Sequence, residues 1–126
     1  ARLRVLLVED HSDTAAALAD LMRLQGHEVR IAGTVAQALS AAAEESRIDL
    51  VISDLGLPDG NGQDLMRQLA EEFGLRGIAL SGYGMEDDVR RSREAGFERH
   101  LTKPVNLEAL ESAIQQVAAG NGSAGS

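Results

Sequence analysis

The sequence predicts an α/β domain built on a parallel sheet. Short apolar runs alternate with segments of helical period, and this alternation occurs five times along the chain. Most of the apolar runs have no polar face, which is typical of strands that helices cover on both sides. Repeated strand–helix units of this kind form a parallel sheet. The strands are expected at residues 3–8, 28–32, 49–53, 77–80 and 99–102.

The helices between these strands are indicated by capping residues. Ser12 or Asp13 is expected to cap the first helix, Thr34 with Gln37 forms a capping box for the second, and Asn106 precedes the fifth. Glycine often ends a helix because it adopts positive φ without strain. Helix stops before the next strand are therefore predicted at three glycines, Gly26, Gly74 and Gly96.

The last two helices differ in their apolar content. The fifth has an apolar stripe at spacings of three and four, made by Leu107, Leu110, Ile114 and Val117. The fourth, expected at residues 85–95, is mostly charged, and Val89 is nearly alone as an apolar residue. We therefore expect the fourth helix to be weakly held.

The length of 126 residues fits one domain. Residues 1–118 are expected to form it, and residues 119–126 have the composition of a flexible linker or a terminal tail. The chain begins with Ala1 and not with methionine, so either routine processing or excision from a longer polypeptide is left open.

Composition excludes several classes of function. There is no cysteine, so a disulfide framework, a zinc–thiolate site and a thiol nucleophile are excluded, and a cytoplasmic location is expected. The net charge of -8 and the three aromatic residues argue against direct nucleic-acid binding. No apolar run approaches the roughly 20 residues of a membrane span, so no membrane contact is expected.

Polar residues follow four of the five predicted strands. The first strand ends in Glu9 and Asp10, the third in Asp54, the fourth in Ser81, and the fifth is followed by Lys103. Because the carboxyl ends of parallel strands meet at one edge, these side chains should converge there. Taken singly, each is a helix cap, a turn residue or a solvated lysine. Their coincidence favours a shared site.

The chemistry of this set favours phosphoryl transfer. Three carboxylates brought together repel one another unless a hard cation binds among their oxygens, and Mg²⁺ is the natural candidate. Mg²⁺ also shares its site readily with phosphate oxygens. Lys103 adds a positive charge and Ser81 a hydroxyl donor, each able to contact a phosphoryl oxygen. A carboxylate nucleophile, a metal and two donors make a complete set.

These motifs resemble the receiver domain of bacterial response regulators in two-component signalling. They read VLLVED, VISDLGLPDGNG, ALSGYG and HLTKPVNLEAL, and the similarity runs from about residue 2 to residue 117. The resemblance implies a flavodoxin-like, doubly wound sheet of order 2-1-3-4-5, with two helices on one face and three on the other. Such domains stand alone, as in chemotaxis-type regulators, or lie at the carboxyl end of hybrid histidine kinases. The last third of the chain is similar to the latter group.

The resemblance also implies a role for each residue. Asp54 would accept the phosphoryl group from a phosphohistidine on a histidine kinase or a phosphotransfer protein. Asp54 and Asp10 would bind Mg²⁺ directly, Glu9 would reach the metal through water, and Gly56 would lend its carbonyl oxygen. The lysine of the family corresponds to Lys103.

A switch is implied as well. Ser81 would turn toward the bound phosphoryl group, and His100, at a position where the family usually has Tyr or Phe, would change rotamer. The face formed by the fourth helix, fifth strand and fifth helix would then signal to a downstream protein or an attached kinase core. A packing role for His100 is the simpler alternative. For the three arginines at positions 90, 91 and 93, a solvated helix face is favoured over a docking patch.

Some features depart from the family or remain outside the site. Gly56 and Tyr83 stand two residues after Asp54 and Ser81, where they flank the path of the hydrolytic water, so the phosphorylated lifetime is left open. Two further histidines, His11 and His27, are expected at the surface.

Two other functions would use a similar set of residues. A haloacid-dehalogenase-like phosphatase needs a second aspartate two positions after the nucleophile, and Gly56 stands there. A pseudo-receiver that signals without phosphate would have lost part of the acidic pocket or the lysine, and this chain has both.

Overall fold

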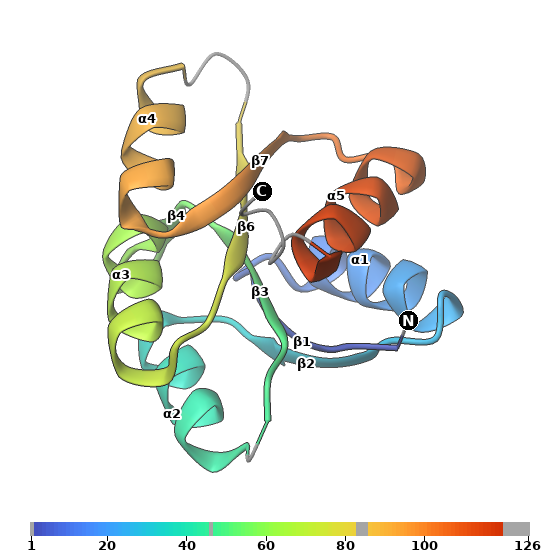
Figure 1. Ribbon diagram of the computed structural model, residues 1–126, viewed down its shortest axis with the longest axis horizontal. Helices are drawn as coiled ribbons and strands as arrows, with labels where there is room; N and C mark the ends of the chain where they lie inside the picture. The colour runs from blue at the N-terminus through green and yellow to red at the C-terminus, as the bar shows by residue number, and fades with distance from the viewer. Residues whose placement is uncertain (1, 46, 83–85, 120–126) are drawn as a thin grey trace.

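A central parallel sheet of five strands forms the core of the molecule (Figure 1). The computed structural model describes residues 2–45, 47–82 and 86–119. The strand order is β2-β1-β3-β6-β7, and each neighbouring pair is parallel. In chain order of the long strands this is the predicted order 2-1-3-4-5, so the flavodoxin-like fold class is confirmed. The strands are β1 (Arg4–Val8), β2 (Glu28–Ala32), β3 (Leu50–Asp54), β6 (Gly77–Ser81) and β7 (Phe97–Thr102).

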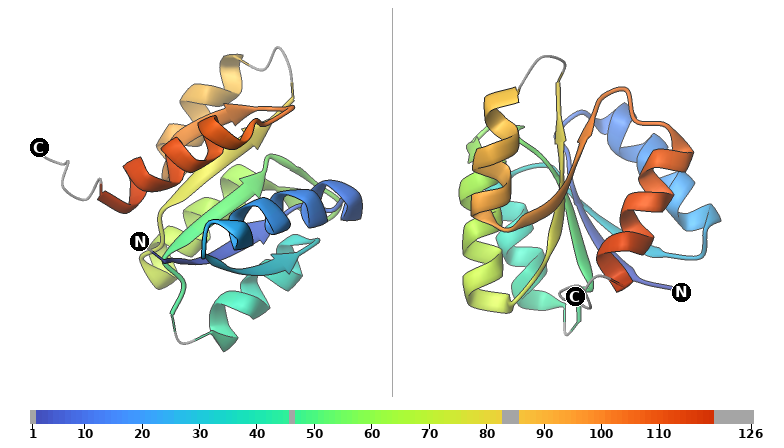
Figure 2. Two further views of the ribbon diagram at one scale, coloured as in Figure 1. Left: turned by 90° about the vertical axis from the view of Figure 1, so that its right-hand side faces the viewer. Right: turned by 45° about the horizontal axis from the view of Figure 1, so that its top comes forward.

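The helices form one layer on each side of the sheet, as Figure 2 shows. Two helices, α1 (Ser12–Leu24) and α5 (Leu107–Ala119), cover one face. The other face is covered by α2 (Val35–Glu44), α3 (Gly62–Phe73) and α4 (Glu86–Ala95). Each layer encloses its own apolar core, because the side chains of β1, β3 and β6 are buried on both faces. The predicted division into two and three helices is therefore correct.

Strand boundaries agree with the sequence to within one residue, except at the last strand. β7 begins at Phe97, two residues before the predicted start. A register irregularity at Gly77 and Ile78 lets Phe97 pair with Gly77 there. A two-stranded hairpin of β4 (Gly56–Leu57) and β5 (Gly60–Asn61) was not predicted. Two-residue strands are too short to produce a periodic pattern.

Most of the predicted helix ends are confirmed. Thr34 caps α2 by accepting a hydrogen bond from the Gln37 amide, and Asn106 caps α5 by accepting one from Ala109. All three predicted glycine stops have positive φ, with values of 95°, 67° and 120° for Gly26, Gly74 and Gly96. The second half of the predicted capping box differs, since the Gln37 side chain accepts from the amide of Gly33 and not from that of Thr34.

Three expectations about single residues are wrong. The cap of α1 is His11, without a side-chain cap bond, and Ser12 is already the first helical residue. His27 is buried and not at the surface, because its Nδ1 accepts a hydrogen bond from the Leu3 amide while its ring packs near Glu111 of α5. Leu107 is 39% exposed, so the buried stripe of α5 begins at Leu110.

Some predictions fall outside the described residues. They concern Tyr83, Met85 and residues 120–126, and the side chain of Val89 is not described either. In the described part of α4, Ser92 and Ala95 are buried, and the weak anchoring of this helix stays a prediction. The boundary between domain and tail stays a prediction too.

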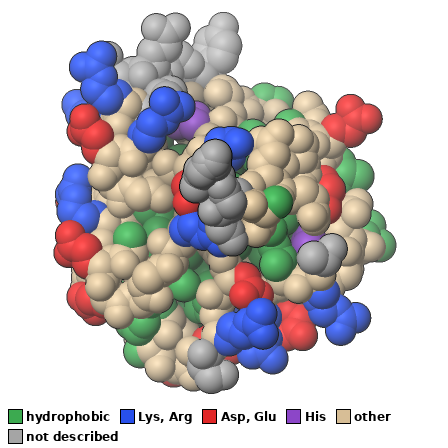
Figure 3. Space-filling view, viewed as in Figure 1, with side chains coloured by type: hydrophobic (Ala, Val, Ile, Leu, Met, Phe, Trp, Pro, Cys, Tyr) green, Lys and Arg blue, Asp and Glu red, His purple; other side chains and the backbone are tan. Residues whose placement is uncertain are grey.

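Charged side chains of both signs are interspersed on the face that Figure 3 shows. Among the described helices, none has the length and apolar character that crossing a membrane requires.

Candidate functional site

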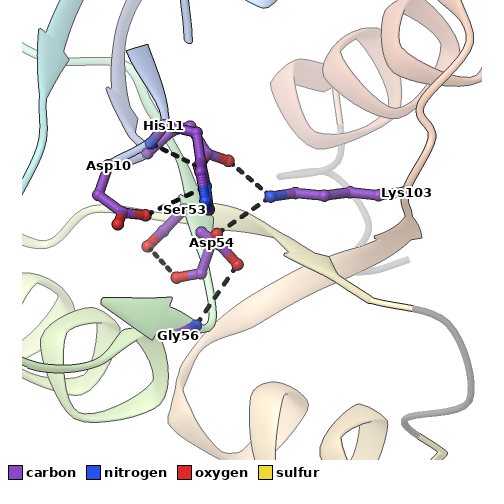
Figure 4. Close-up of polar contacts among 7 residues, drawn as sticks. Asp10, His11, Ser53, Asp54, Gly56 and Lys103 are labelled. Carbon is purple, nitrogen blue, oxygen red and sulfur yellow. Dashed lines mark hydrogen bonds and ion pairs between the residues drawn. The ribbon is translucent and has the colours of Figure 1, made fainter. Parts of the chain in front are cut away.

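The polar residues predicted to share a site lie together at the carboxyl edge of the sheet. β1 runs into Glu9 and Asp10, β3 ends with Asp54, and β7 runs into Lys103. Figure 4 shows the side chains of Asp10, Asp54 and Lys103 converging from the ends of these three strands. β6 brings Ser81 to the same edge, where the Ser81 carbonyl accepts a hydrogen bond from the Lys103 amide at 2.9 Å.

Lys103 joins the first and third strands through its ammonium group. Its Nζ donates to Glu9 Oε1 at 2.7 Å and to Asp54 Oδ2 at 3.0 Å. Burial alone lowers the pKa of Lys103, but the hydrogen bonds that it donates to both carboxylates and the charges of those carboxylates outweigh burial, so its pKa is raised above the ordinary value. Lys103 is therefore a fixed positive charge beside Asp54.

Glu9 is a buried carboxylate held by three donors. Its side chain has no solvent exposure, and its Oε2 lies 3.1 Å from both the backbone nitrogen and the ring Nδ1 of His11. Burial raises the pKa of Glu9, whereas the hydrogen bonds from Lys103 and His11 lower it, and their sum leaves the pKa below its ordinary value. Glu9 thus remains ionised at neutral pH.

A group of candidate metal ligands lies beside this ion pair. One ligand atom from each of Glu9, Asp10, His11 and Asp54 lies within 4.8 Å of all the others. His11 Nδ1 is 3.5 Å from Asp10 Oδ1. The hydrogen bond that the His11 ring makes to Glu9, together with the charges of Asp10 and Glu9, raises the pKa of His11. Three carboxylates against one lysine leave an excess of negative charge, which suits a divalent cation.

The loop after β3 folds back against the backbone of Asp54. The Gly56 amide points to Asp54 Oδ1 at 3.4 Å, and Ser53 Oγ donates to the Asp54 carbonyl at 2.8 Å. A side chain at Gly62 would collide with that same carbonyl oxygen, so the start of α3 requires glycine there. At Gly56, by contrast, an added Cβ would meet no atom within 4 Å. The space beside the Asp54 carboxylate is open on this side.

Ser81 is buried and already engaged. Its Oγ lies 2.5 Å from His100 Nε2, so the hydroxyl and the imidazole on neighbouring strands are hydrogen-bonded. Ser81 and His100 were predicted as a pair of switch residues, and the structure places them in direct contact. Which of the two donates depends on the tautomer of the ring.

One residue at this edge, His11, was expected to lie outside the site. His11 is exposed, as expected, but its ring contacts two of the carboxylates. Its position directly after Glu9 and Asp10 was the available signal. A side chain next to two predicted metal ligands is close enough to join them.

These residues provide oxygen ligands, a lysine and a hydroxyl around one carboxylate. Hard divalent cations prefer carboxylate oxygens, and phosphoryl oxygens pair with ammonium and hydroxyl donors. The donor set therefore fits Mg²⁺ and a phosphoryl group at Asp54.

The comparison with protein families agrees with this geometry. Residues 5–115 match the family model described as response regulator receiver domain. The chain is 33% identical over 119 residues to an uncharacterised 14.6 kDa protein of Leptolyngbya boryana, with 92% of this chain and 90% of that protein covered. It is 31% identical to the transcriptional regulatory protein PdtaR of Mycobacterium tuberculosis, with 89% and 55% covered. The chain spans about half the length of most of the curated relatives that it matches.

Solved structures give the same result. The receiver domain protein (CheY-like) of Methanospirillum hungatei has a TM-score of 0.88 at 26% identity, with 99% of this chain and 100% of that chain covered. The receiver domain protein of Clostridium thermocellum has the same TM-score and identity, with 94% and 96% covered. The family match, the strand order and the shared carboxyl-edge site lead to one conclusion: the chain belongs to the response regulator receiver domains of two-component signalling.

Proposed function

We propose that this domain accepts a phosphoryl group on Asp54 and passes the signal to a protein partner. A carboxylate oxygen of Asp54 attacks phosphorus of a phosphohistidine, so that a P–O bond forms as the P–N bond breaks. The imidazole nitrogen leaves with the electron pair and takes up a proton. The observation that carries the proposal is the contact of Lys103 with both Glu9 and Asp54 at the edge where Asp10 also lies.

Lys103 and the carboxylates would divide the electrostatic work. Lys103 needs only to turn from Asp54 Oδ2 toward a phosphoryl oxygen while its bond to Glu9 holds it in place. Asp10 and Asp54 are assigned as direct Mg²⁺ ligands, Glu9 as a ligand through water, and Gly56 as the source of a carbonyl ligand. Bound Mg²⁺ would offset the negative charge that grows on the phosphoryl oxygens.

The signal would leave the site through Ser81. A phosphoryl group on Asp54 offers the Ser81 hydroxyl a charged acceptor in place of the ring of His100. When Ser81 turns toward it, the hydrogen bond to His100 is lost and His100 changes rotamer. His100 lies on β7, which packs against α4 and α5, so this face is assigned as the output surface. A pre-existing equilibrium between two states is shifted.

The phosphoryl donor is proposed to be a histidine kinase or a histidine phosphotransfer protein. An apolar groove between α1 and the segment after β7 reaches Lys103, and its lining includes Ala17, Leu21, Pro104 and Val105. A helix presenting phosphohistidine fits such a groove. Ala17→Arg is expected to slow transfer from a phosphorylated donor protein at least tenfold and to leave uptake from acetyl phosphate unchanged. A downstream protein or an attached kinase core is the proposed receiver of the signal, in the cytoplasm.

The acceptor is tested with acetyl phosphate in the presence and absence of Mg²⁺. Intact-protein mass spectrometry should show one added phosphoryl group with Mg²⁺ and none without it. Asp54→Asn should abolish the gain, and Asp64→Asn, at an exposed carboxylate of α3, should not. Uptake that persists in Asp54→Asn would remove Asp54 as the acceptor. If neither wild type nor either variant takes up a phosphoryl group, a pseudo-receiver that signals without phosphate is favoured.

A further inference from the structure

His11 differs in chemistry from the three carboxylates around it. Its Nδ1 lies 3.1 Å from Glu9 Oε2 and 3.5 Å from Asp10 Oδ1. Figure 4 shows the ring beside Asp10 at the edge where Asp54 ends its strand. His11 therefore places a nitrogen ligand among the oxygen ligands of the proposed cation site.

The ring is not used by the fold. His11 stands at the cap position of α1, but its side chain makes no capping hydrogen bond there. The side chain is 72% exposed, so it contributes little to packing. Its ring contacts Glu9 and Asp10, two of the carboxylates around the proposed cation site. Among the described residues, the His11 side chain therefore neither caps α1 nor packs in the interior.

The distances suit a single ion. Around an octahedral cation with bonds of about 2.1 Å, neighbouring ligand atoms are about 3 Å apart and opposite ones about 4 Å apart. The ligand atoms of Asp10, His11 and Asp54 lie within 4.8 Å of one another, so small side-chain rotations bring them to this range.

Glu9 would not lose its support if the ring turned to a cation. Its Oε2 keeps the hydrogen bond from the His11 backbone amide, and its Oε1 keeps Lys103. A buried carboxylate without donors would be costly, and here both oxygens remain paired. The ring can therefore be recruited without disturbing the ion pair beneath it.

We propose that His11 is a metal ligand and that it gives this site a preference for first-row transition cations such as Mn²⁺ over Mg²⁺. The inference rests on the proposed cation site of the phosphoryl acceptor. Mg²⁺ takes oxygen ligands and gains little from imidazole, whereas imidazole is a good ligand for transition ions. An all-oxygen site lacks this nitrogen ligand. Mn²⁺ accepts oxygen and nitrogen ligands together and still binds phosphoryl oxygens.

The test is equilibrium binding of Mn²⁺ and of Mg²⁺ to the unphosphorylated protein, with pulsed electron paramagnetic resonance of bound Mn²⁺ as the direct readout. The wild type should show electron spin-echo modulation from a directly bound ¹⁴N nucleus. His11→Gln, which keeps a polar side chain of similar size, should lose this modulation. It should bind Mn²⁺ about tenfold more weakly and Mg²⁺ with less than about a twofold change.

Two control variants separate this inference from the function on which it rests. Asp10→Asn should weaken binding of both cations, and Asp64→Asn, on the exposed surface of α3, should change neither. Absence of the ¹⁴N signal in the wild type, with equal Mn²⁺ affinities for wild type and His11→Gln, overturns the role of His11 and leaves the acceptor site intact. Binding that Asp10→Asn does not weaken overturns the cation site itself, and with it both proposals.

Discussion

The two ends of the sheet treat charge in different ways. At the amino ends of the strands, cations and anions are matched: Arg4 pairs with Glu28, and Arg47 pairs with Asp49. Three of these four side chains are more than 40% exposed. Exposed pairs of this kind contribute about 0–1 kcal/mol each because water already solvates the separate charges. Charge at this end keeps the surface hydrated and has little further consequence.

At the carboxyl ends the charges are concentrated and unmatched. Glu9 and Asp54 share Lys103, Asp10 lies in the same cluster beside His11, and the Glu9 side chain is fully buried. The carboxylates outnumber the lysine, and a divalent cation would offset the remaining negative charge. The contrast in charge between the two ends therefore points to the same edge of the sheet as the motifs do.

Packing also differs between the two ends of the sheet, and it is tighter at the amino end. At the amino end of β6, a Cβ on Gly77 would lie 2.5 Å from Met66 Sδ and 3.0 Å from the Val51 carbonyl oxygen. At the carboxyl end, a Cβ on Gly56 would touch nothing within 4 Å. One end is closed by side chains and backbone, and the other leaves room beside Asp54 for a phosphoryl group and water.

The largest effect is expected at the closed end. Gly77→Ala should lower the free energy of unfolding by about 2–3 kcal/mol, because Met66 and the Val51 backbone must move to admit the methyl group. Gly56→Ala is the matched control and should change stability by less than about 1 kcal/mol, since its site is open. Urea unfolding of the three proteins measures both values. Equal destabilisation by the two substitutions would remove the steric contrast.

The next effect concerns the shared lysine. Lys103→Met should lower the free energy of unfolding by about 2 kcal/mol in metal-free buffer, because the buried Glu9 carboxylate loses its cation. This value is below that for a fully buried pair, since the Lys103 side chain is 26% exposed. Arg4→Met, at the amino end, should cost less than about 1 kcal/mol.

Adding Mg²⁺ sharpens the lysine prediction. A cation that binds the folded state alone should recover part of the stability of Lys103→Met and leave Arg4→Met unchanged relative to wild type. Chemical unfolding with and without Mg²⁺ measures the recovery. A similar loss in both variants, insensitive to Mg²⁺, would show that the two ends do not differ electrostatically.

The sequence was sufficient to predict what depends on local pattern. Runs of apolar residues located the strands, and three glycines located helix ends at which φ is positive. Convergence of Asp54 and Lys103 followed from the rule that parallel strands bring their carboxyl ends to one edge. Because these signals are carried within a few residues, they do not require knowledge of the tertiary structure.

Long-range contacts were not predictable in this way. His27 was expected at the surface, but the Leu3 amide 24 residues away donates a hydrogen bond to its ring, which lies in the interior. Asp59 accepts hydrogen bonds from the Val35 and Ala36 amides at the start of α2, again across more than 20 residues. Such partners are decided by how the elements pack, which leaves no periodic mark in the sequence.

The pH dependence of stability should also differ between substitutions at the two ends of the sheet. The pKa of Glu9 is lowered in the folded state relative to its ordinary value of 4.5. Its contribution to stability is therefore fully present above pH 4.5 and is lost as pH falls through the lower folded pKa. The free energy of unfolding of wild type should exceed that of Glu9→Gln by about 1 kcal/mol at pH 7, and this difference should narrow below about pH 4.5.

The control for this prediction lies at the amino end. Glu28→Gln alters a carboxylate whose side chain is 60% exposed, so its gap from wild type should stay within about 0.5 kcal/mol across the same pH range. Urea midpoints between pH 3 and pH 7 give both gaps. A Glu9 gap that is constant down to pH 3 would mean that the buried carboxylate is not linked to proton binding.

The smallest effect is expected from closing the open end. Gly56→Met places a side chain in the empty space next to Asp54, where it should hinder the water that hydrolyses the acyl phosphate. Loss of the phosphoryl group should slow about threefold, which corresponds to less than about 1 kcal/mol in the barrier. Phosphate release from purified phosphoprotein measures the rate. The acyl phosphate in urea-unfolded protein is the control, because there the side chain at position 56 has no fixed place and both proteins should hydrolyse equally fast. A folded-state rate equal to that of wild type would mean that water reaches Asp54 from another side, and the open space at Gly56 would then have no part in setting the lifetime of the signal.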